Sequence, residues 1–242
     1  MAGVSVPPSI LIIGANRGIG NELATRFQAK GFDVYGTYRP QTRGDSSVTE
    51  LKAQGVKTFE VDFTDEDSLA AAAQEFGDAT LDILVNCAGS YMLWADDKSF
   101  AEMGPDDVLR EFKVNVMGPF MASKAFLPAL SRADHPKIIT MSSDMASIKD
   151  NKGGNISYRI SKAGVNQLTK TMAVDLQKAG SRVEALAVHP GWVPTKMAGF
   201  YGEDDMDTCM SALVDTMCRF GGESEGIPNG AYVRWDGEPM DL

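Results

Sequence analysis

The sequence predicts a single α/β domain whose doubly wound parallel sheet of about seven strands carries helices on both faces. Short apolar segments alternate with longer helical patterns along the whole chain, which is typical of a parallel sheet with covering helices. The short segments are apolar at successive positions, as in Lys137-Ile-Ile-Thr-Met, and this pattern indicates strands buried on both faces. The 242 residues contain no repeat, low-complexity tract or linker, so residues 1–242 are expected to form one domain.

Local signals place the elements in chain order. The first strand is the β-branched run before Gly14, and a helical pattern follows it. Asp65 can cap a helix with an acidic first turn, and Pro105 stands where a first helical residue tolerates a missing N–H. We expect strands at residues 9–13, 33–38, 57–61, 81–86, 137–142, 182–189 and 230–234. We expect helices at residues 19–30, 65–76, 106–132 and 158–178.

Two segments break the alternation. Residues 90–103 form a predicted loop, and residues 197–222 are acidic and then apolar. Both follow strands, so both are expected at the carboxyl edge of the sheet, where ligands bind in this architecture. Helical spacing in the second segment predicts one apolar helix face made by Met206, Met210, Leu213 and Met217. We expect a substrate lid at about residues 195–222.

The composition excludes several classes of partner. The formal net charge of −10 disfavours nucleic acid and anionic membranes, because the field of the whole molecule repels phosphates. No apolar run reaches the roughly 18 residues that span a bilayer, and no signal peptide is recognisable. Three cysteines without CxxC spacing are expected to be reduced packing residues of a cytoplasmic protein. The two histidines lie far apart, so no metal site is expected.

A glycine-rich loop joins the first predicted strand to the first helix. Its residues are Gly14, Ala15, Asn16, Arg17, Gly18, Ile19 and Gly20. Glycines here let the backbone turn tightly and let a diphosphate approach, and the amides at the helix N-terminus then face the anion. The spacing differs from the standard dinucleotide fingerprint Gly-x-Gly-x2-Gly, but the loop still predicts a cofactor site.

Arginines near this loop favour NADP(H) over NAD(H). An acidic residue at the end of the second strand would bind the ribose of NAD, whereas arginine there suits a 2′-phosphate. The sequence has Arg39 at that place and Arg17 inside the loop, with no carboxylate beside Arg39. Arg43 is close enough in sequence to contribute as a third arginine.

Other strand ends supply candidates for binding the adenosine. Asp62, with Phe63 beside it, follows the third strand and could accept a hydrogen bond from an adenine amino group. Asn86, Ala88 and Gly89 end the fourth strand, where small residues permit close approach of the cofactor. Ordinary strand-end turns remain an alternative explanation for the Asp and the Asn.

Tyr158 and Lys162 are the predicted proton-transfer residues. Four positions apart on a helix, they lie on one face. A free tyrosine has a pKa of about 10, and an adjacent ammonium together with an oxidised nicotinamide favours the phenolate and lowers that pKa. Ser142 and Ser143 end the preceding strand, and a serine there can donate a hydrogen bond to a carbonyl oxygen as charge builds on it.

Taken together, these motifs resemble the short-chain dehydrogenase/reductase family over about residues 9–237. The motifs are Gly14-x3-Gly18-x-Gly20, Asn86-Cys87-Ala88-Gly89, Asn115, Ser143, Tyr158-x3-Lys162 and Pro190-Gly191. The resemblance implies a Rossmann-type fold. It also implies that Tyr158 donates the proton in reduction and that Ser143, rather than Ser142, orients the carbonyl. Lys162 would tune the acidity of Tyr158 and bind the nicotinamide ribose. Asn115 would hold a water that links Lys162 to solvent.

The resemblance extends to the segment after the sixth strand. Pro190, Gly191, Val193 and Thr195 would pass the carboxamide of the nicotinamide, with the last two as contacts. The long helices are those that commonly form the subunit contact in this family, which implies a homo-oligomer, either a dimer or a tetramer.

Further motifs resemble one branch of the family, the sniffer, C-factor and fungal ketoreductase group. They are Gly-Ala-Asn-Arg-Gly-Ile-Gly, the spacer that begins at Ser147, His-Pro-Gly-Trp-Val and the ending Asp236-Gly-Glu. That branch is largely NADPH-dependent, so the resemblance implies an NADPH-dependent carbonyl reductase. Lys196 departs from the branch, because an aspartate is usual there.

Apolar side chains predict the substrate pocket. They are Tyr91, Trp94, Met145, Trp192 and Tyr201. A largely apolar pocket suits a small-molecule ketone or aldehyde that is bulky or aromatic.

Three alternatives stay open from the sequence. A non-catalytic NADP(H)-binding regulator could use the same fold, and NADP-dependent alcohol oxidation could be the physiological direction. A hydrolase would use Ser224, or Ser143 with His189. The segment Gly222-Glu-Ser-Glu-Gly lacks the preceding strand and following helix that a nucleophile elbow needs.

Overall fold

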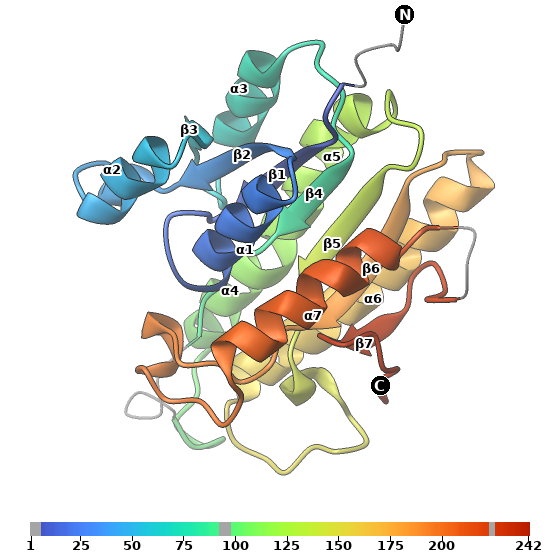
Figure 1. The fold of residues 1–242 in the computed structure, drawn as a ribbon. Coiled ribbons are helices and arrows are strands. Elements are labelled where there is room, and N and C mark those ends of the chain that lie inside the picture. The colour runs from blue at the N-terminus through green and yellow to red at the C-terminus, as the bar shows by residue number, and fades with distance from the viewer. Residues whose placement is uncertain (1–5, 92–97, 223–225) are drawn as a thin grey trace, which may run out of the picture.

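The structure, a computed structural model, describes residues 6–91, 98–222 and 226–242. Its centre is a parallel sheet with the strand order β3-β2-β1-β4-β5-β6-β7 (Figure 1). The strands are β1 (Ser9–Ile13), β2 (Asp33–Tyr38), β3 (Lys57–Glu60), β4 (Ile83–Asn86), β5 (Lys137–Met141), β6 (Glu184–His189) and β7 (Tyr232–Arg234). The order reverses between β1 and β4, and the crevice at such a switch point is where this architecture binds ligands.

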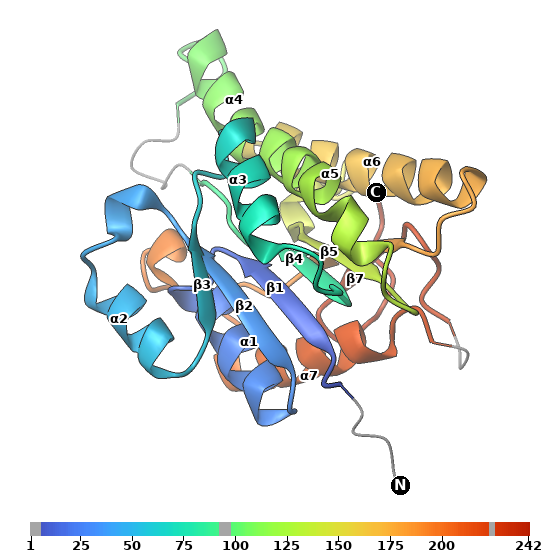
Figure 2. The same ribbon diagram turned by 90° about the horizontal axis from the view of Figure 1, so that it is seen from above.

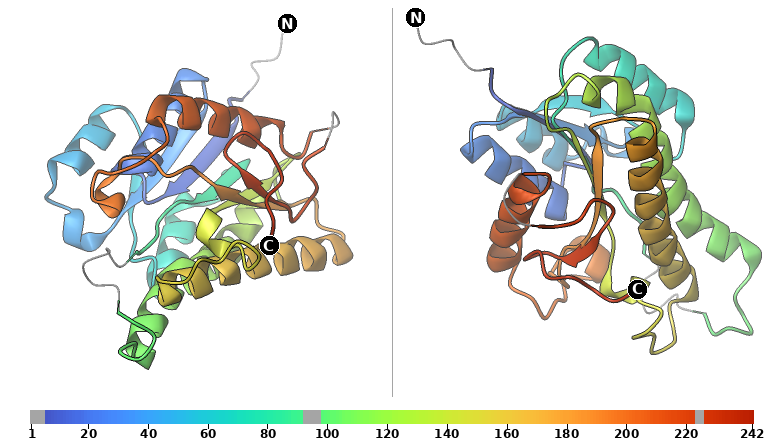
Figure 3. Two further views of the ribbon diagram at one scale, coloured as in Figure 1. Left: turned by 90° about the horizontal axis from the view of Figure 1, so that it is seen from below. Right: turned by 90° about the vertical axis from the view of Figure 1, so that its right-hand side faces the viewer.

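Helices cover both faces of the sheet, which gives three layers (Figures 2 and 3). The helices are α1 (Gly18–Ala29), α2 (Ser46–Ala53), α3 (Glu66–Phe76), α4 (Pro105–Phe112), α5 (Gly118–Leu130), α6 (Ile156–Lys178) and α7 (Met206–Arg219). One face packs against α1 and α7, and the other packs against α3, α5 and α6. The predicted fold class, a single doubly wound α/β domain, is therefore confirmed.

The side chains of β1 point alternately to the two faces of the sheet, and this explains why the strands are apolar throughout. Ile10 and Ile12 lie in the core cluster that contains α1 and α7, whereas Leu11 and Ile13 lie in the cluster of the opposite face. Successive side chains of a strand point to opposite faces, so a strand with helices on both sides has no position for an exposed polar side chain. All five residues of β1 are buried.

The region predicted as one helix over residues 106–132 is divided. α4 ends at Phe112, a π-helical turn η3 (Lys113–Met117) follows, and α5 begins at Gly118. Single π-helical turns inside α-helices occur frequently at functional sites. The turn here carries Asn115.

Two other helices, α2 and α7, are absent from the helix ranges predicted from the sequence. α2 was not predicted, because only Val48 and Leu51 of its eight residues are buried and they make no repeating pattern. α7 forms where the methionine spacing predicted an apolar face, and Met210, Leu213 and Met217 are buried against the sheet. A lid role can therefore apply only to the loop that precedes α7.

Candidate active site

The glycine loop is folded so tightly that its first and last glycines cannot be replaced without movement. Gly14 has φ +86° and donates its N–H to Thr37 Oγ1 at 2.9 Å. A Cβ on Gly20 would lie 2.1 Å from the carbonyl oxygen of Gly14. The loop thus brings the start of α1 directly against the end of β1.

The N-terminus of α1 is open to an anion. Its N-cap residue, Arg17, makes no side-chain capping hydrogen bond, and the first turn holds no acidic residue. The first amides of a helix have no partner within the helix, and together with the helix dipole they attract phosphate. Thr195 completes the surroundings, because its Cγ2 lies 3.5 Å from the position of a Cβ on Gly18. The loop after β6 and the glycine loop therefore face each other.

The three arginines near the glycine loop differ in their partners. Arg17 and Arg39 are exposed, and within the described part of the chain neither guanidinium has a hydrogen bond or an ion pair. Arg43 instead forms a two-bonded ion pair with Glu60, which raises the pKa of Arg43 and lowers that of Glu60. Arg17 and Arg39 are the guanidinium groups available to a phosphate, and Arg43 has a protein partner.

Asp62 and Phe63 lie just beyond β3. Asp62 Oδ1 accepts hydrogen bonds from the amide and the hydroxyl of Thr64, at 2.9 and 2.8 Å. These bonds, the backbone one first, lower the pKa of the Asp62 carboxyl. The Phe63 side chain is buried, and a Cβ on Gly118 would lie 2.7 Å from its ring. The Phe63 ring therefore packs on the start of α5.

Asn86 and Ala88 stand at the switch point between β1 and β4. Asn86 is buried, and its Nδ2 lies 3.3 Å from both Ser123 Oγ and Thr140 Oγ1. Its Oδ1 has no hydrogen-bond partner among the described residues. Ala88 donates its N–H to Ile13 O at 2.8 Å, and its Cβ lies 3.0 Å from where a Cβ on Gly14 would be.

Ser143, Tyr158 and Lys162 come together at the carboxyl edge, from the end of β5 and the start of α6. Ser143 lies close enough to Tyr158 to influence its pKa, and Lys162 Nζ lies 5.5 Å from the centre of the Tyr158 ring. Lys162 is buried and donates to Met141 O at 2.7 Å. An ammonium has three donors, and among the described residues this is the one hydrogen bond of Lys162 Nζ, so two donors are left for a ligand.

The two serines that follow β5 point to different surroundings. Ser142 Oγ donates to Asn166 Oδ1 at 2.6 Å and is buried inside the sheet–α6 contact. Ser143 is the one that contacts Tyr158. The alternation of a strand explains the difference, since neighbouring side chains face opposite sides.

Burial dominates the electrostatics of Tyr158 and Lys162. Burial raises the pKa of Tyr158 above its ordinary value, and the hydrogen bond from Ser143 offsets part of that rise. Burial lowers the pKa of Lys162 to about 8. Desolvation is the largest influence on the pKa of Tyr158 in the structure, so Tyr158 is the protonated phenol at neutral pH. The lowering expected from the ammonium together with an oxidised nicotinamide stays a prediction.

Asn115 joins the π-helical turn to the loop after β4. Its Nδ2 donates to Ser90 O at 2.8 Å and to Ser161 Oγ at 2.9 Å, and its Oδ1 accepts from Ser90 N at 2.8 Å. A Cβ on Gly89 would lie 3.3 Å from this oxygen and 3.8 Å from Lys162 Nζ. The side chain therefore fixes the loop that borders Lys162.

The segment after β6 turns sharply beneath α7. Gly191 has φ +92°, and a Cβ there would lie 2.9 Å from Cys209 Sγ. Pro190 and Val193 are buried, whereas Thr195 faces the glycine loop. Of the four residues predicted to pass the nicotinamide, Thr195 is the one that the structure brings against the glycine loop.

The predicted substrate residues differ in their distance from the reacting group. The Tyr91 ring lies edge-on to the Tyr158 ring, with 4.7 Å between centroids. Met145 is half-buried beside Ser143, and its amide donates to Ser143 Oγ at 3.2 Å. Trp192 is partly exposed, and Tyr201 is 76% exposed on the loop before α7. Trp94 lies outside the described residues.

Two acidic residues of the site were not predicted. Glu111 is fully buried on α4 and accepts a hydrogen bond from Ser157 Oγ at 2.8 Å, one residue before Tyr158. Asp144 accepts a hydrogen bond from Ser143 Oγ at 2.9 Å. Asp144 could have been found from its position after the serine, whereas no pattern in the sequence marks Glu111.

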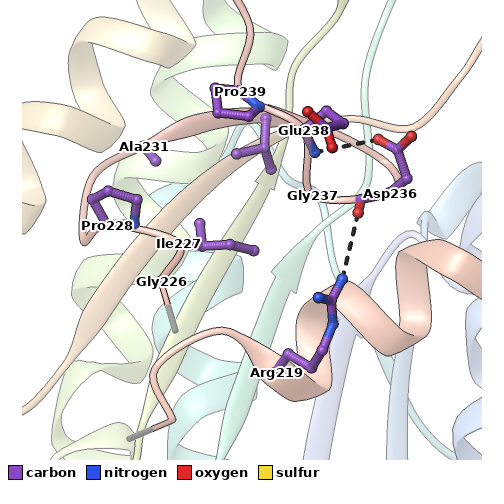
Figure 4. A pocket seen from close by; sticks show the side chains of 10 residues that line it. Arg219, Gly226, Ile227, Pro228, Ala231, Asp236, Gly237, Glu238 and Pro239 are labelled. Carbon is purple, nitrogen blue, oxygen red and sulfur yellow. Dashed lines mark hydrogen bonds between the residues drawn. The ribbon is translucent and has the colours of Figure 1, made fainter. Parts of the chain in front are cut away.

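Other kinds of site find little support in the described residues. No three His, Cys, Asp or Glu side chains there could hold a metal ion, and no helix there is long and apolar enough to cross a membrane. His189 Nδ1 is buried without a partner in that part of the chain, and Ser224 lies outside it. A separate hollow of about 380 Å³ lies between Arg219 and the turn at Asp236 (Figure 4). None of the predicted site residues lines it.

Comparisons with known proteins agree with this geometry. Residues 8–205 match the short chain dehydrogenase family. The 1-hydroxy-2-glutathionyl-2-methyl-3-butene dehydrogenase of Rhodococcus sp. is 29% identical over 239 residues, which cover 94% of this chain and 99% of that protein. The carbonyl reductase Sniffer of D. melanogaster is similar with a TM-score of 0.86 and 28% identity, covering 98% of this chain and 100% of that one. The NADPH-bound carbonyl reductase from chicken fatty liver has a TM-score of 0.84 and 26% identity, with the same coverage. The chain belongs to the short-chain dehydrogenase family of oxidoreductases.

Proposed function

We propose that this protein is an NADPH-dependent reductase that transfers a hydride to a ketone or aldehyde, with Tyr158 as the general acid. The observation that carries the proposal is the convergence of Ser143, Tyr158 and the Lys162 ammonium at the carboxyl edge. Two relatives support the cofactor, since the chicken carbonyl reductase is described with NADPH and a Burkholderia multivorans family member with NADP. NADPH, when bound, supplies the hydride.

The residues of the crevice fit such a cofactor. The uncapped N-terminus of α1 suits the diphosphate. The guanidinium groups of Arg17 and Arg39, which have no partner in the part of the chain that the structure describes, suit a 2′-phosphate. Lys162 keeps two donors for the hydroxyls of a ribose. Asn86 Oδ1, buried without a partner among the described residues, can accept a further hydrogen bond.

The reacting residues can then orient the carbonyl and supply a proton. Tyr158 Oη donates to the carbonyl oxygen, and Ser143 Oγ donates to it as well once its single proton turns away from Asp144 Oδ1. As negative charge builds on the carbonyl oxygen these bonds strengthen. The proton on Tyr158 Oη passes to that oxygen and completes the alcohol. The Lys162 ammonium stabilises the phenolate that this step leaves behind.

Reduction is the favoured direction. Because burial raises the pKa of Tyr158, the phenol is the form that is ready at neutral pH, and a proton donor is what reduction requires. Alcohol oxidation would start from the phenolate, and the Rhodococcus relative is named a dehydrogenase, so oxidation stays the second candidate. A regulator without catalysis has no need for the three converging groups.

A carbonyl panel tests the function. Purified protein is mixed with NADPH or NADH and a series of aliphatic, aromatic and quinone carbonyl compounds, and the absorbance of the reduced nicotinamide is followed. We expect oxidation of NADPH with bulky or aromatic members, because Tyr91 offers apolar surface at Tyr158 and Met145 offers it beside Ser143. Turnover confined to small polar sugars or hydroxy acids would contradict the substrate class, and no turnover with any member would contradict the reductase itself.

The cofactor preference has a separate test in Arg39→Asp. The variant should weaken NADPH binding by about ten- to a hundred-fold, because it removes a charge-assisted bond to the 2′-phosphate and adds a repulsion. NADH binding should change little. Arg182→Asp is the matched control, because it makes the same charge change beyond the opposite edge of the sheet, before β6. An equal effect of Arg39→Asp on both cofactors would contradict this role.

We also propose that the protein works in the cytoplasm as a homo-oligomer. Leu109, Met117 and Phe120 are exposed along α4, η3 and α5, and burial of such a surface by a second copy would be favourable. Light scattering in solution tests this part, since a mass equal to one chain at all concentrations would contradict it.

A further inference from the structure

Asp144 places a fixed carboxylate beside the reacting group. Its Oδ1 accepts hydrogen bonds from Ser143 Oγ at 2.9 Å and from Met145 N at 2.8 Å. Within the described part of the chain, Oδ2 has no hydrogen-bond partner and the carboxylate takes part in no ion pair. The residue is exposed, so a molecule bound against Ser143 would meet this charge.

The field of this carboxylate reaches groups on three different elements. Burial raises the pKa of Tyr158 most, and Asp144 adds to the rise. Asp144 likewise raises the pKa of Tyr232 on β7, after burial, and opposes the burial that lowers the pKa of His189 on β6. These groups surround the carboxyl edge where Ser143 lies, so the charge faces the site.

The cations nearby form no ion pair with Asp144 among the described residues. The Arg159 guanidinium donates to three backbone carbonyls, two in the loop before α6 and one in the short helix η4 (Asp144–Ala146). Lys162 is buried and donates to Met141 O. A second carboxylate, Asp204, lies on the loop after β6 and accepts a hydrogen bond from Trp192 N at 2.6 Å. Burial lowers the pKa of His189, and Asp144 and Asp204 both raise it, so two carboxylates act at the edge of the sheet where Ser143 lies.

We propose that Asp144 makes this site selective for carbonyl compounds that carry no negative charge near the carbonyl, and that it repels keto acids. A carboxylate attached next to the carbonyl would stand within several ångströms of Asp144, and like charges at that separation near a protein surface cost about ten-fold in kcat/KM. A neutral ester, ketone or aldehyde meets no such repulsion, and a hydroxyl or ammonium group of a substrate can donate to Oδ2. This inference rests on the proposed reductase function.

Matched pairs of substrates test the selectivity. Phenylglyoxylate is compared with its methyl ester, and 4-acetylbenzoate with its methyl ester, each with saturating NADPH. The readout is the ratio of kcat/KM for ester over acid, measured for the unmodified protein, for Asp144→Asn and for Asp134→Asn. Any effect of a variant on both members of a pair cancels in this ratio. Asp134→Asn makes the same charge change before β5, at the opposite edge of the sheet.

We expect Asp144→Asn to lower the ester-to-acid ratio by about ten-fold and Asp134→Asn to leave it unchanged. Added salt should lower the ratio of the unmodified protein and not that of Asp144→Asn, because salt screens exposed charges. A ratio that stays within about two-fold in Asp144→Asn would overturn the inference. A compound that is not turned over is measured as an inhibitor of an active carbonyl from the panel. Absence of turnover with every carbonyl would instead contradict the reductase function.

Discussion

The charge of the Lys162 side chain should depend on pH in the working range. Because burial lowers its pKa to about 8, kcat/KM for reduction should fall as pH rises through about 8, when the phenolate formed at Tyr158 loses its neighbouring positive charge. Tyr158 itself keeps its proton in this range, because burial raises its pKa. The measurement is a pH profile of kcat/KM.

Lys162→Arg separates this explanation from others. A guanidinium stays protonated at any pH used, so the decline near pH 8 should disappear or move to higher pH even if overall activity is lower. A decline at the same pH in the variant would assign it to another group.

The identities of the site residues could be predicted better than their pKa values and their burial. Tyr158 and Lys162 were found from their spacing, because the helix repeat fixes which side chains share a face. The choice of Ser143 over Ser142 came from the family resemblance. The rise in the pKa of Tyr158 could not be predicted, since it depends on how much water is excluded around the ring. Glu111 was not predicted for a similar reason, because its burial results from the packing of α4 on α6.

The glycine loop and α1 act as one element, and Gly20→Ala tests that view. The added Cβ would lie 2.1 Å from a backbone oxygen, so the loop must shift and the helix amides move away from the diphosphate. We expect NADPH affinity to fall by about ten-fold or more, measured by titration of cofactor fluorescence. Gly44→Ala is the matched control, because a Cβ there meets nothing within 4 Å. Equal affinities of the two variants would contradict the role of the loop.

Element types followed from the sequence, whereas two local features did not. Strand ends were predicted to within about two residues, because glycine, proline and charged residues mark where a strand stops. The π-helical turn at residues 113–117 has no such mark in the sequence. α2 is short and only two of its residues are buried, so tertiary contacts rather than pattern stabilise it.

At the scale of the whole molecule, stability depends on the two apolar layers on either side of the sheet. Phe126 on α5 is fully buried and lies edge-on to Phe76 on α3, with 5.9 Å between ring centroids. Phe126→Ala should lower the free energy of unfolding by about 3–5 kcal/mol, through lost burial and the cavity that remains. Denaturant unfolding measures this change.

Lys124→Ala on the same helix is the control for Phe126→Ala. Its ion pair with Glu66 is exposed, and exposed pairs contribute about 0–1 kcal/mol. If the two substitutions cost the same, the layer around Phe126 would not be the part of the core that we describe.

The central claim is that Tyr158 donates the proton in a carbonyl reduction, and Tyr158→Phe tests it most directly. The variant keeps the ring and its contact with Tyr91 but removes the hydroxyl. NADPH oxidation with the best carbonyl of the panel and the affinity for NADPH are measured side by side. We predict a fall in kcat of about a hundred- to ten-thousand-fold with nearly unchanged NADPH affinity. Turnover retained within about ten-fold, with the cofactor still bound, would contradict the account.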